Sequence, residues 1–521
     1  MSDNADLQLR LIQSLKESTD FPSCNERPIL IETHISTVFL AGDFAWKFKK
    51  PVNFGFLDFS SLDQRKYFCE EELRLNRRLA PDLYLEVVKI TGDPEHPVFG
   101  GEGEALEYAV KMRRFKQEEL FNNLLAEDKL NDQLIRQVGR IAAEFHAQAD
   151  RATLDMPYGS AEAAFDPMQQ NFDQLRELIS DPEQLKQLDK LEHWTQERYE
   201  ALKPILEQRK QDGYIRECHG DMHLGNIALT EGQVAIFDGI EFNDFFRWGD
   251  VMSEIAFLTM DLDHRGAKRL SNIVLNQYLE TSGDYEGLVL LRFYQVYRAM
   301  VRAKVSSFRL AQELTATERE EVLEQYSGFV NLAEYYTQLD QPALVLMHGF
   351  SGSGKTVISG KLATELNAIR IRSDVERKRL NELSADSNAS AAISAGIYSQ
   401  EMTELTYDHL AGLATKLLSA GFTVIIDATF LKRDQRVRFS PLAENWLILD
   451  ITANKADLRN NIEQRSQEGD ASDADLRVLA HQLENHDPIT ADEPSLSIQW
   501  NADLPLDEIR QRLNLRAVTP S

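Results

Sequence analysis

The sequence predicts two domains, an α+β domain followed by an α/β domain with a parallel sheet. A chain of 521 residues is too long for a single hydrophobic core. Strand patterns precede helical patterns in the first part of the chain, whereas strands and helices alternate in the last part. The polar stretch 336–342 separates these parts, and we place the boundary there, which gives domains of residues 1–338 and 339–521.

The first domain opens with a predicted β-hairpin and a helix. Apolar residues alternate through 29–40 and 44–48, and the Gly-Asp pair between these segments is typical of a tight turn. Lys47 lies on the second strand of the hairpin. Residues 61–79 then have the period of an amphipathic helix, with Ser61 at its start. Further strands are predicted near 83–90, 106–112 and 215–238, and helices over 118–210 and 253–335.

The second domain shows the alternation of a parallel α/β sheet. An apolar strand is predicted over 343–347, followed by a loop and a helix over 357–366. Two more strands are predicted at 369–371 and 423–426. Parallel strands joined by helices end at a common edge of the sheet, which is where such folds bind ligands.

The composition argues against several classes of protein. Lys and Arg number 57 against 84 Asp and Glu, and the net charge of −27 repels nucleic acid and anionic membranes. Residues 342–521 hold 19 basic and 25 acidic side chains, a net charge of −6, which leaves −21 for the first 341 residues. The three cysteines lie far apart, and neither a signal peptide nor a run of about 18 apolar residues is found. We therefore expect a cytoplasmic protein without membrane spans or general nucleic-acid binding.

The stretch His219–Asn226 reads HGDMHLGN and has the Asp and Asn spacing of a protein-kinase catalytic loop. Asp221 would orient or deprotonate an acceptor hydroxyl, and Asn226 would bind Mg²⁺. Asp238 follows an apolar strand and precedes a glycine, so it would be the second metal ligand. We expect His223 to brace the loop, because the mechanism needs no second base.

This combination resembles the aminoglycoside phosphotransferase and choline kinase family, whose loop reads His-Gly-Asp-x-His-x-x-Asn. The resemblance covers roughly the first 335 residues and implies a bilobal, protein-kinase-like fold that uses ATP. It implies that Lys47 holds the nucleotide phosphates and that Asp250 is a buried residue that braces the catalytic loop. The helix partner of Lys47 would be one of Glu70, Glu71 and Glu72. The chain departs from the family in lacking a glycine-rich loop in the first hairpin, where residues 33–36 read THIS.

Residues 349–356 fit the G-x-x-x-x-G-K-[ST] phosphate loop at every fixed position. Its backbone N–H groups would bind phosphates, Lys355 would reach the β and γ groups, and Thr356 would bind Mg²⁺. Asp427 ends the strand 423–426 and would act on the Mg²⁺ shell. The predicted nucleotide-binding residues of this loop are Gly349, Phe350, Ser351, Gly352, Ser353, Gly354, Lys355 and Thr356.

Asp374 and Arg377 follow the strand 369–371, at the edge where ligands bind. This Asp-x-x-Arg arrangement resembles small P-loop kinases of the polynucleotide kinase and zeta-toxin type. The resemblance implies that Asp374 activates the acceptor hydroxyl, that Arg377 grips the substrate, and that lid arginines stabilise the transferred group. Arg436, Arg459 and Arg465 are candidates for the lid, and the alternative is a solvated helix face. The order of the two halves resembles bacterial fusions of an aminoglycoside phosphotransferase-like domain with an ATP-binding kinase domain.

The pattern favours a bifunctional kinase that uses ATP and Mg²⁺ to phosphorylate hydroxyl groups of small-molecule acceptors. Two alternatives stay open, as do the acceptors and the oligomeric state. In the first, one half, more plausibly the N-terminal one, is a degenerate or nucleotide-sensing module that regulates the other. In the second, the C-terminal half phosphorylates the 5′-hydroxyl of polynucleotides or nucleosides. The basic residues that support this second alternative are Arg370, Arg372, Arg377, Lys378, Arg379, Lys432, Arg433, Arg436 and Arg438.

Overall fold

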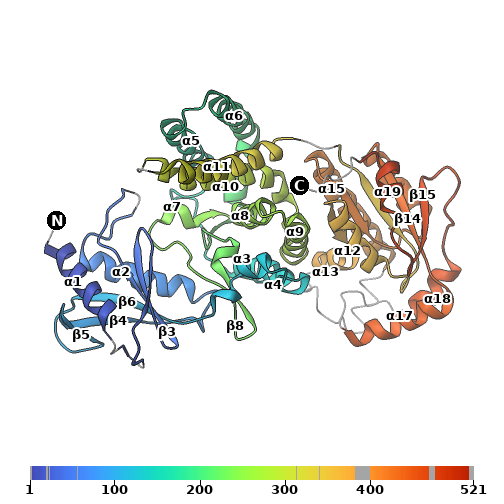
Figure 1. The fold of residues 1–521 in the computed structure, drawn as a ribbon. Helices are drawn as coiled ribbons and strands as arrows, with labels where there is room; N and C mark the ends of the chain where they lie inside the picture. The colour runs from blue at the N-terminus through green and yellow to red at the C-terminus, as the bar shows by residue number, and fades with distance from the viewer. Residues whose placement is uncertain are drawn as a thin grey trace. The chain divides into compact units, whose positions relative to one another are not determined.

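The structure, a computed structural model, divides the chain into two compact units that interleave along the sequence (Figure 1). The first unit contains Met1–Asp261 and Tyr297–Ser327, and the second contains Leu262–Val296 and Gly328–Ser521. No helix among the residues that the structure describes is both long and apolar enough to cross a membrane. The described residues are 3–18, 21–22, 24–55, 57–311, 314–338, 341–381, 399–468 and 476–515.

The first unit begins with a six-stranded antiparallel sheet in the order β1-β2-β3-β6-β4-β5. The strands are β1 (Ile29–Glu32), β2 (Ser36–Ala41), β3 (Phe44–Lys49), β4 (Tyr84–Asp93), β5 (His96–Phe99) and β6 (Glu107–Arg113). Trp46 and Phe48 of β3 are buried in a core that also contains Leu11 of helix α1 (Asp3–Glu17). Because side chains alternate along a strand, Lys47 and Lys49 face the other side of the sheet.

That other side of the sheet is covered by helix α2 (Leu62–Asn76), which packs on β4 and β6 (Figure 1). Ser61 is its N-cap and accepts a hydrogen bond from the N–H of Gln64, as the sequence predicts. Glu72 lies on the buried face of α2 and is fully enclosed. The lysines of β3 and this glutamate therefore meet between sheet and helix.

A helical lobe completes the first unit. Two short antiparallel strand pairs are inserted in it: β7 (Ile215–Glu217) with β10 (Trp248–Asp250), and β8 (Ile227–Thr230) with β9 (Gln233–Ile236). The loop between β7 and β8 contains the predicted catalytic loop. The helices are α3 (Phe121–Ala126), α4 (Asp132–Gln148), α5 (Ala161–Leu178), α6 (Pro182–Gln211), α7 (Asp244–Arg247) and residues of α8 (Val251–His264), α10 (Leu291–Ser307) and α11 (Ala316–Tyr336).

The second unit is built on a five-stranded parallel sheet in the order β12-β13-β11-β14-β15. The strands are β11 (Leu344–His348), β12 (Ile369–Arg372), β13 (Val424–Asp427), β14 (Trp446–Thr452) and β15 (Ser495–Gln499). The helices confined to this unit are α9 (Lys268–Ser282), α12 (Lys355–Glu365), α13 (Ser373–Leu380), α15 (Gln400–Ser419), α16 (Arg433–Phe439), α17 (Lys455–Glu468), α18 (Leu476–Glu484) and α19 (Leu506–Arg512). All strand pairs are parallel, so β11, β12 and β13 end at one edge of the sheet.

The predicted fold class is confirmed: a kinase-like α+β region precedes an α/β region with a parallel sheet. The strands predicted at 343–347, 369–371 and 423–426 are β11, β12 and β13, with their ends shifted by one residue. The last two strands, β14 and β15, were not predicted. Helix α9 belongs to the P-loop unit by its contacts, although it precedes that region in the sequence.

Candidate functional site

Lys47 of β3 lies between two carboxylates of the first unit. Its Nζ is 2.8 Å from Oε1 of Glu72 and 2.6 Å from Oδ1 of Asp238. Of the three candidate partners on α2, the structure therefore selects Glu72. Burial would lower the pKa of Lys47, but Asp238 and Glu72 raise it well above its ordinary value. The ammonium group is thus held in its charged form.

A second lysine, Lys49, was not predicted. It lies two residues along β3, and its Nζ is 2.7 Å from Oε2 of Glu72 and also contacts Glu241. Burial would raise the pKa of Glu72, but Lys47 and Lys49 lower it from 4.5 to about 2. The signal that could have revealed Lys49 is the two-residue period of the strand, which puts both lysines on one face.

The catalytic loop holds Asp221 and Asn226 together. Nδ2 of Asn226 donates to the carbonyl oxygen and to Oδ2 of Asp221, each at 3.0 Å. The ring of His223 accepts from the N–H of Gly225, and its Nε2 lies 3.4 Å from Oδ2 of Asp221, so it braces the loop. Burial would raise the pKa of Asp221, but His223 lowers it below its ordinary value. Asp221 is therefore an ionised hydrogen-bond acceptor near neutral pH.

The segment with Asp238 is hydrogen-bonded directly to this loop. The N–H of Phe237 donates to the carbonyl oxygen of Asn226, and the N–H of Ile240 donates to that of His219, both at 2.9 Å. Asp238 itself has a φ of 62°, a left-handed conformation that is uncommon outside glycine. Nδ2 of Asn226 is engaged with Asp221, so the amide oxygen is its available ligand atom. Asn226 and Asp238 thus offer the oxygen ligands that suit Mg²⁺.

The carboxylate that holds the start of the catalytic loop is that of Glu254 of α8, not that of Asp250. Glu254 is buried and accepts hydrogen bonds from the N–H of Gly220 at 2.8 Å and of His219 at 3.2 Å. Asp250 is also buried, but its carboxylate pairs with Arg209 at 2.7 and 2.8 Å. The prediction that Asp250 is buried is therefore confirmed, but the prediction that it contacts the catalytic loop is wrong. Glu254, one helical turn later, makes that contact instead.

The phosphate loop follows β11 and leads into α12, as the motif requires. Gly349 has a φ of 142°, and a Cβ there would lie 2.6 Å from the carbonyl oxygen of Ile451. Gly352 has a φ of 80°, and its Cβ would lie 2.4 Å from the carbonyl oxygen of Leu458. Both positions therefore require glycine.

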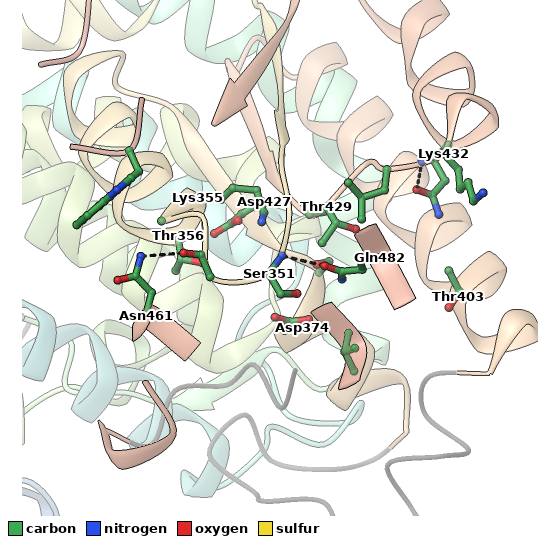
Figure 2. Close-up of a pocket in the computed structure, with 18 of the residues that line it drawn as sticks. Ser351, Lys355, Thr356, Asp374, Thr403, Asp427, Thr429, Lys432, Asn461 and Gln482 are labelled. Carbon is green, nitrogen blue, oxygen red and sulfur yellow. Dashed lines mark hydrogen bonds between the residues drawn. The ribbon is translucent and has the colours of Figure 1, made fainter. Parts of the chain in front are cut away.

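Lys355 folds over the loop that carries it. Its Nζ donates to the carbonyl oxygens of Gly349 and Phe350, each at 2.8 Å. Asp427 at the end of β13 accepts a hydrogen bond from Ser359 of α12 at 2.9 Å. Figure 2 shows Lys355, Thr356 and Asp427 grouped together beside the loop. The arrangement brings the predicted lysine, hydroxyl and carboxylate to one place.

These residues line a cleft of about 1660 Å³ in the second unit. Asp374 and Arg377, both on α13, line it too, and Arg377 is largely buried with Nη1 3.3 Å from the hydroxyl of Thr403. Gly349, Phe350 and Ser353 belong to the loop but are not part of the cleft wall. The predicted residues that the cleft brings together are Ser351, Gly352, Gly354, Lys355, Thr356, Asp374, Arg377 and Asp427.

Two amide side chains reach the phosphate loop from helices that the sequence did not implicate. Oε1 of Gln482 on α18 accepts from the N–H of Ser351 at 2.9 Å, and Nδ2 of Asn461 on α17 donates to the carbonyl oxygen of Gly352 at 2.8 Å (Figure 2). Both residues line the cleft. No motif marks either residue, because an isolated Asn or Gln on a helix carries no recognisable pattern.

The lid interpretation is wrong for Arg436. This side chain is fully buried on α16 and forms a two-point ion pair with Glu493, at 2.7 and 3.1 Å. Its remaining hydrogen bonds go to backbone carbonyl groups, including that of Phe430. Arg459 is exposed on α17, and the side chain of Arg465 lies outside the described residues. Arg436 therefore stabilises the fold and does not line the cleft.

Comparisons with known proteins find two different family regions along the chain. A family model described as "Phosphotransferase enzyme family" matches residues 62–291, and one described as "AAA domain" matches residues 344–489. The uncharacterized protein Rv2004c of Mycobacterium tuberculosis is 30% identical over 412 residues, which cover 79% of each chain. The uncharacterized protein Mb2027c of Mycobacterium bovis matches to the same extent.

Several solved structures are similar to parts of this chain. A choline/ethanolamine kinase family protein from Mesorhizobium loti is 11% identical with a TM-score of 0.38, covering 63% of this chain and 98% of its own. A spectinomycin phosphotransferase is 12% identical with a TM-score of 0.33, covering 60% and 93%. A sugar kinase from Janibacter sp. HTCC2649 is 21% identical with a TM-score of 0.27, covering 35% and 97%.

The two family models match in the order in which the two kinds of site occur along the chain. The mycobacterial relatives are similar over more residues than either matched region contains. The chain therefore belongs to the family of these mycobacterial proteins, and it is a kinase in which a phosphotransferase domain precedes a P-loop domain.

Proposed function

We propose that this kinase has two separate phosphotransfer sites, each of which moves the γ-phosphoryl group of ATP to a hydroxyl of a small molecule with Mg²⁺. The observation that carries the proposal is the position of Lys47, between Glu72 and Asp238. A Lys–Glu pair beside a metal-binding Asp is the arrangement that kinases need for transfer. A domain that only senses a nucleotide also has no need of a catalytic-loop carboxylate such as Asp221, which Asn226 holds in place.

In the first site Lys47 would bind the nucleotide phosphates, and Asn226 and Asp238 would hold Mg²⁺. Asp221 accepts the hydrogen bond of the acceptor hydroxyl and takes its proton as the new P–O bond forms. The bond between the γ-phosphorus and the bridging oxygen breaks, and ADP leaves. Mg²⁺ supplies charge neutralisation on the phosphates when it is bound.

In the second site the backbone N–H groups of the phosphate loop and Lys355 would bind the phosphates, while Thr356 and Asp427 would serve the Mg²⁺ shell. Asp374 would accept the proton of the acceptor, and Arg377 would position that acceptor. Pockets for drug-sized ligands are typically about 300–1,000 Å³. The cleft of about 1660 Å³ has room for a nucleotide and a small acceptor together.

A regulatory first half is the second candidate, and one observation favours it. The turn at residues 33–36 contains no glycine, and the hydroxyl of Thr33 accepts from the N–H groups of Ile35 and Ser36. These two N–H groups already donate to the side chain of Thr33, so they are less able to bind a phosphate. In that case the first half would bind ATP but would not transfer its γ-phosphoryl group.

The 5′-hydroxyl nucleic-acid alternative has less support. Most of the basic residues on which it rests form ion pairs inside the second unit, such as Arg370 and Arg372 with Glu280, Arg433 with Asp492 and Arg438 with Glu404. Paired cations attract a phosphate backbone weakly, because their charge is already neutralised. We therefore favour small acceptors for both sites.

The test is a screen of cell metabolite extracts with labelled ATP, using the wild type, Asp221→Asn and Lys355→Ala. We expect each variant to lose one set of labelled products and keep the other. Loss of all products in either variant would refute independent catalysis and favour the regulatory alternative. A 5′-hydroxyl oligonucleotide that becomes labelled in a Lys355-dependent manner would instead establish the nucleic-acid alternative.

A further inference from the structure

Helix α9 lies along the edge strand of the parallel sheet. Strand β12 is the first in the sheet order, so one side of it has no neighbouring strand. Helix α9 packs there, and both elements belong to the second unit. Residues 268–282 nevertheless fall within the phosphotransferase family match, 62–291, and not within the P-loop match, 344–489. The P-loop unit therefore takes a helix from outside its own family region.

The side chain of Asn276 bonds to β12 in the way a strand would. Its Nδ2 donates to the carbonyl oxygen of Ala368 at 3.0 Å, and its Oδ1 accepts from the N–H of Arg370 at 2.7 Å. A residue of a neighbouring parallel strand makes these same two bonds, one on each side of Ile369. Asn272, one turn earlier on α9, donates to the same carbonyl at 3.1 Å. The amide groups thus satisfy backbone groups that an edge strand would otherwise leave unpaired.

Glu280, one turn after Asn276, continues the same face of α9. Its two oxygens each accept at 2.9 Å, one from Nη2 of Arg370 and the other from Nη1 of Arg372. All three side chains are at most 16% exposed. Burial would raise the pKa of Glu280, but Arg372 and Arg370 lower it below its ordinary value. The carboxylate is therefore charged and holds two arginines of β12 at once.

These two arginines lie next to the residues proposed for catalysis. Nη1 of Arg370 donates to the carbonyl oxygen of Thr356 at 3.2 Å, and Thr356 lines the cleft. Arg372 ends β12, and Asp374 lies two residues further, in the first turn of α13. Glu280 thus connects the residue proposed for Mg²⁺ with the strand end that carries the proposed base. Arg379 of α13 also donates to the carbonyl oxygen of Glu280, at 2.6 Å.

We propose that Glu280 and Asn276 are positioning residues of the P-loop site, and that they fix the separation between Thr356 and Asp374 through Arg370 and β12. The inference rests on the proposed function of that site. Neither residue lines the cleft. Their effect is on the rate of transfer, because the geometry of reacting groups affects turnover far more than it affects binding by the backbone of the loop.

The test uses the full chain in an Asp221→Asn background, so that turnover reports the P-loop site alone. ADP formation from Mg·ATP, with a fixed amount of cell metabolite extract as the source of acceptor, gives kcat and the KM for ATP of Glu280→Gln, Arg370→Met and the double variant. We expect Glu280→Gln to lower kcat by about 10- to 100-fold and to change KM less than about threefold. The double variant should be no slower than Arg370→Met alone, since both act through one contact.

The matched control is Glu286→Gln, which removes an exposed partner of Lys416 in the same unit and should leave kcat unchanged. Hydrogen exchange of β13 shows whether the second unit is folded in each variant. If Glu280→Gln loses this protection, Asn276→Asp takes its place, because its carboxylate still accepts from Arg370 but cannot donate to Ala368.

Three results would overturn the inference. The first is a kcat of Glu280→Gln equal to that of the Glu286→Gln control. The second is a double variant whose fold-loss in kcat is the product of the losses in Glu280→Gln and Arg370→Met. A parent with no Lys355-dependent turnover contradicts the proposed function itself, and the inference with it. An active parent with unaffected variants contradicts the positioning role alone.

Discussion

Replacement of Glu254 by Gln should loosen the catalytic loop of the first site. The carboxylate accepts from the N–H groups of His219 and Gly220 and lies 2.6 Å from Nε2 of His146. It is 2% exposed, so water cannot replace these contacts. Glutamine keeps the size of the side chain but turns one acceptor into a donor that faces other donors.

The magnitude follows from the pKa of Glu254. Burial would raise this pKa, but His146, His219 and the N–H of Gly220 lower it from 4.5 to about 2. A difference of about 2.5 pH units corresponds to about 3 kcal/mol of stability for the ionised form. Because the folded pKa is depressed, this stability is fully present above pH 4.5 and is lost as the pH falls towards 2. More than half of it should be gone at about pH 3.

The assay is native-state hydrogen exchange of a peptide that covers residues 217–226, because a chain of two units has no single free energy of unfolding. At pH 7 the opening free energy of this peptide should be about 3 kcal/mol lower in Glu254→Gln than in the wild type. Glu127→Gln, which removes an exposed partner of Lys129, should change it by less than about 1 kcal/mol. The reasoning would be refuted if Glu254→Gln lowered the opening free energy no more than this control does. It would also be refuted if the difference in opening free energy between wild type and Glu254→Gln did not shrink between pH 4.5 and 3.

Three further predictions concern other buried charges. Glu72→Gln leaves Lys47 and Lys49 without their shared carboxylate, and transfer by the first site should fall about 100-fold while Lys355-dependent turnover stays constant; an equal loss at both sites would contradict separate catalysis. Lys355→Met should abolish turnover by the P-loop site and leave the thermal transition within a few degrees of the wild type, measured by calorimetry; retained turnover would exclude the proposed role. Arg436→Met strands the carboxylate of Glu493 and should destabilise the second unit by about 3 kcal/mol, measured by hydrogen exchange of β13; a stable variant with a lowered kcat would instead restore the lid role.

The local structures that the sequence predicted correctly are made by residues that are neighbours both in the chain and in space. The phosphate loop is a local structure of consecutive residues, and Ser61 caps its own helix, so both are visible in the sequence. Asn226 lies five residues after Asp221, and their hydrogen bond joins residues that the motif already places in one loop. Such features depend on backbone geometry that the local pattern determines.

The features that could not be predicted depend on contacts between distant segments. Glu254 meets Gly220 across 34 positions, and nothing in the pattern around Glu254 distinguishes it from Asp250 as the brace. Arg436 looks like a lid residue because its neighbours are charged, yet its partner Glu493 lies 57 residues away and buries it. Asn276 reads as an ordinary polar position of a helix until the strand 92 residues further on is placed beside it.

The strand-like amide of Asn276 bears on how the two halves could be exchanged in evolution or by engineering. A P-loop cassette cut at the polar stretch near residue 340 would lack α9 and expose a bare strand edge, and such edges recruit foreign strands and promote aggregation. The boundary between the units also falls inside α8, α10 and α11, so no single cut separates them. The mycobacterial relatives match over 412 residues, a length that must include parts of both halves. A P-loop cassette that keeps this strand edge covered must therefore include α9.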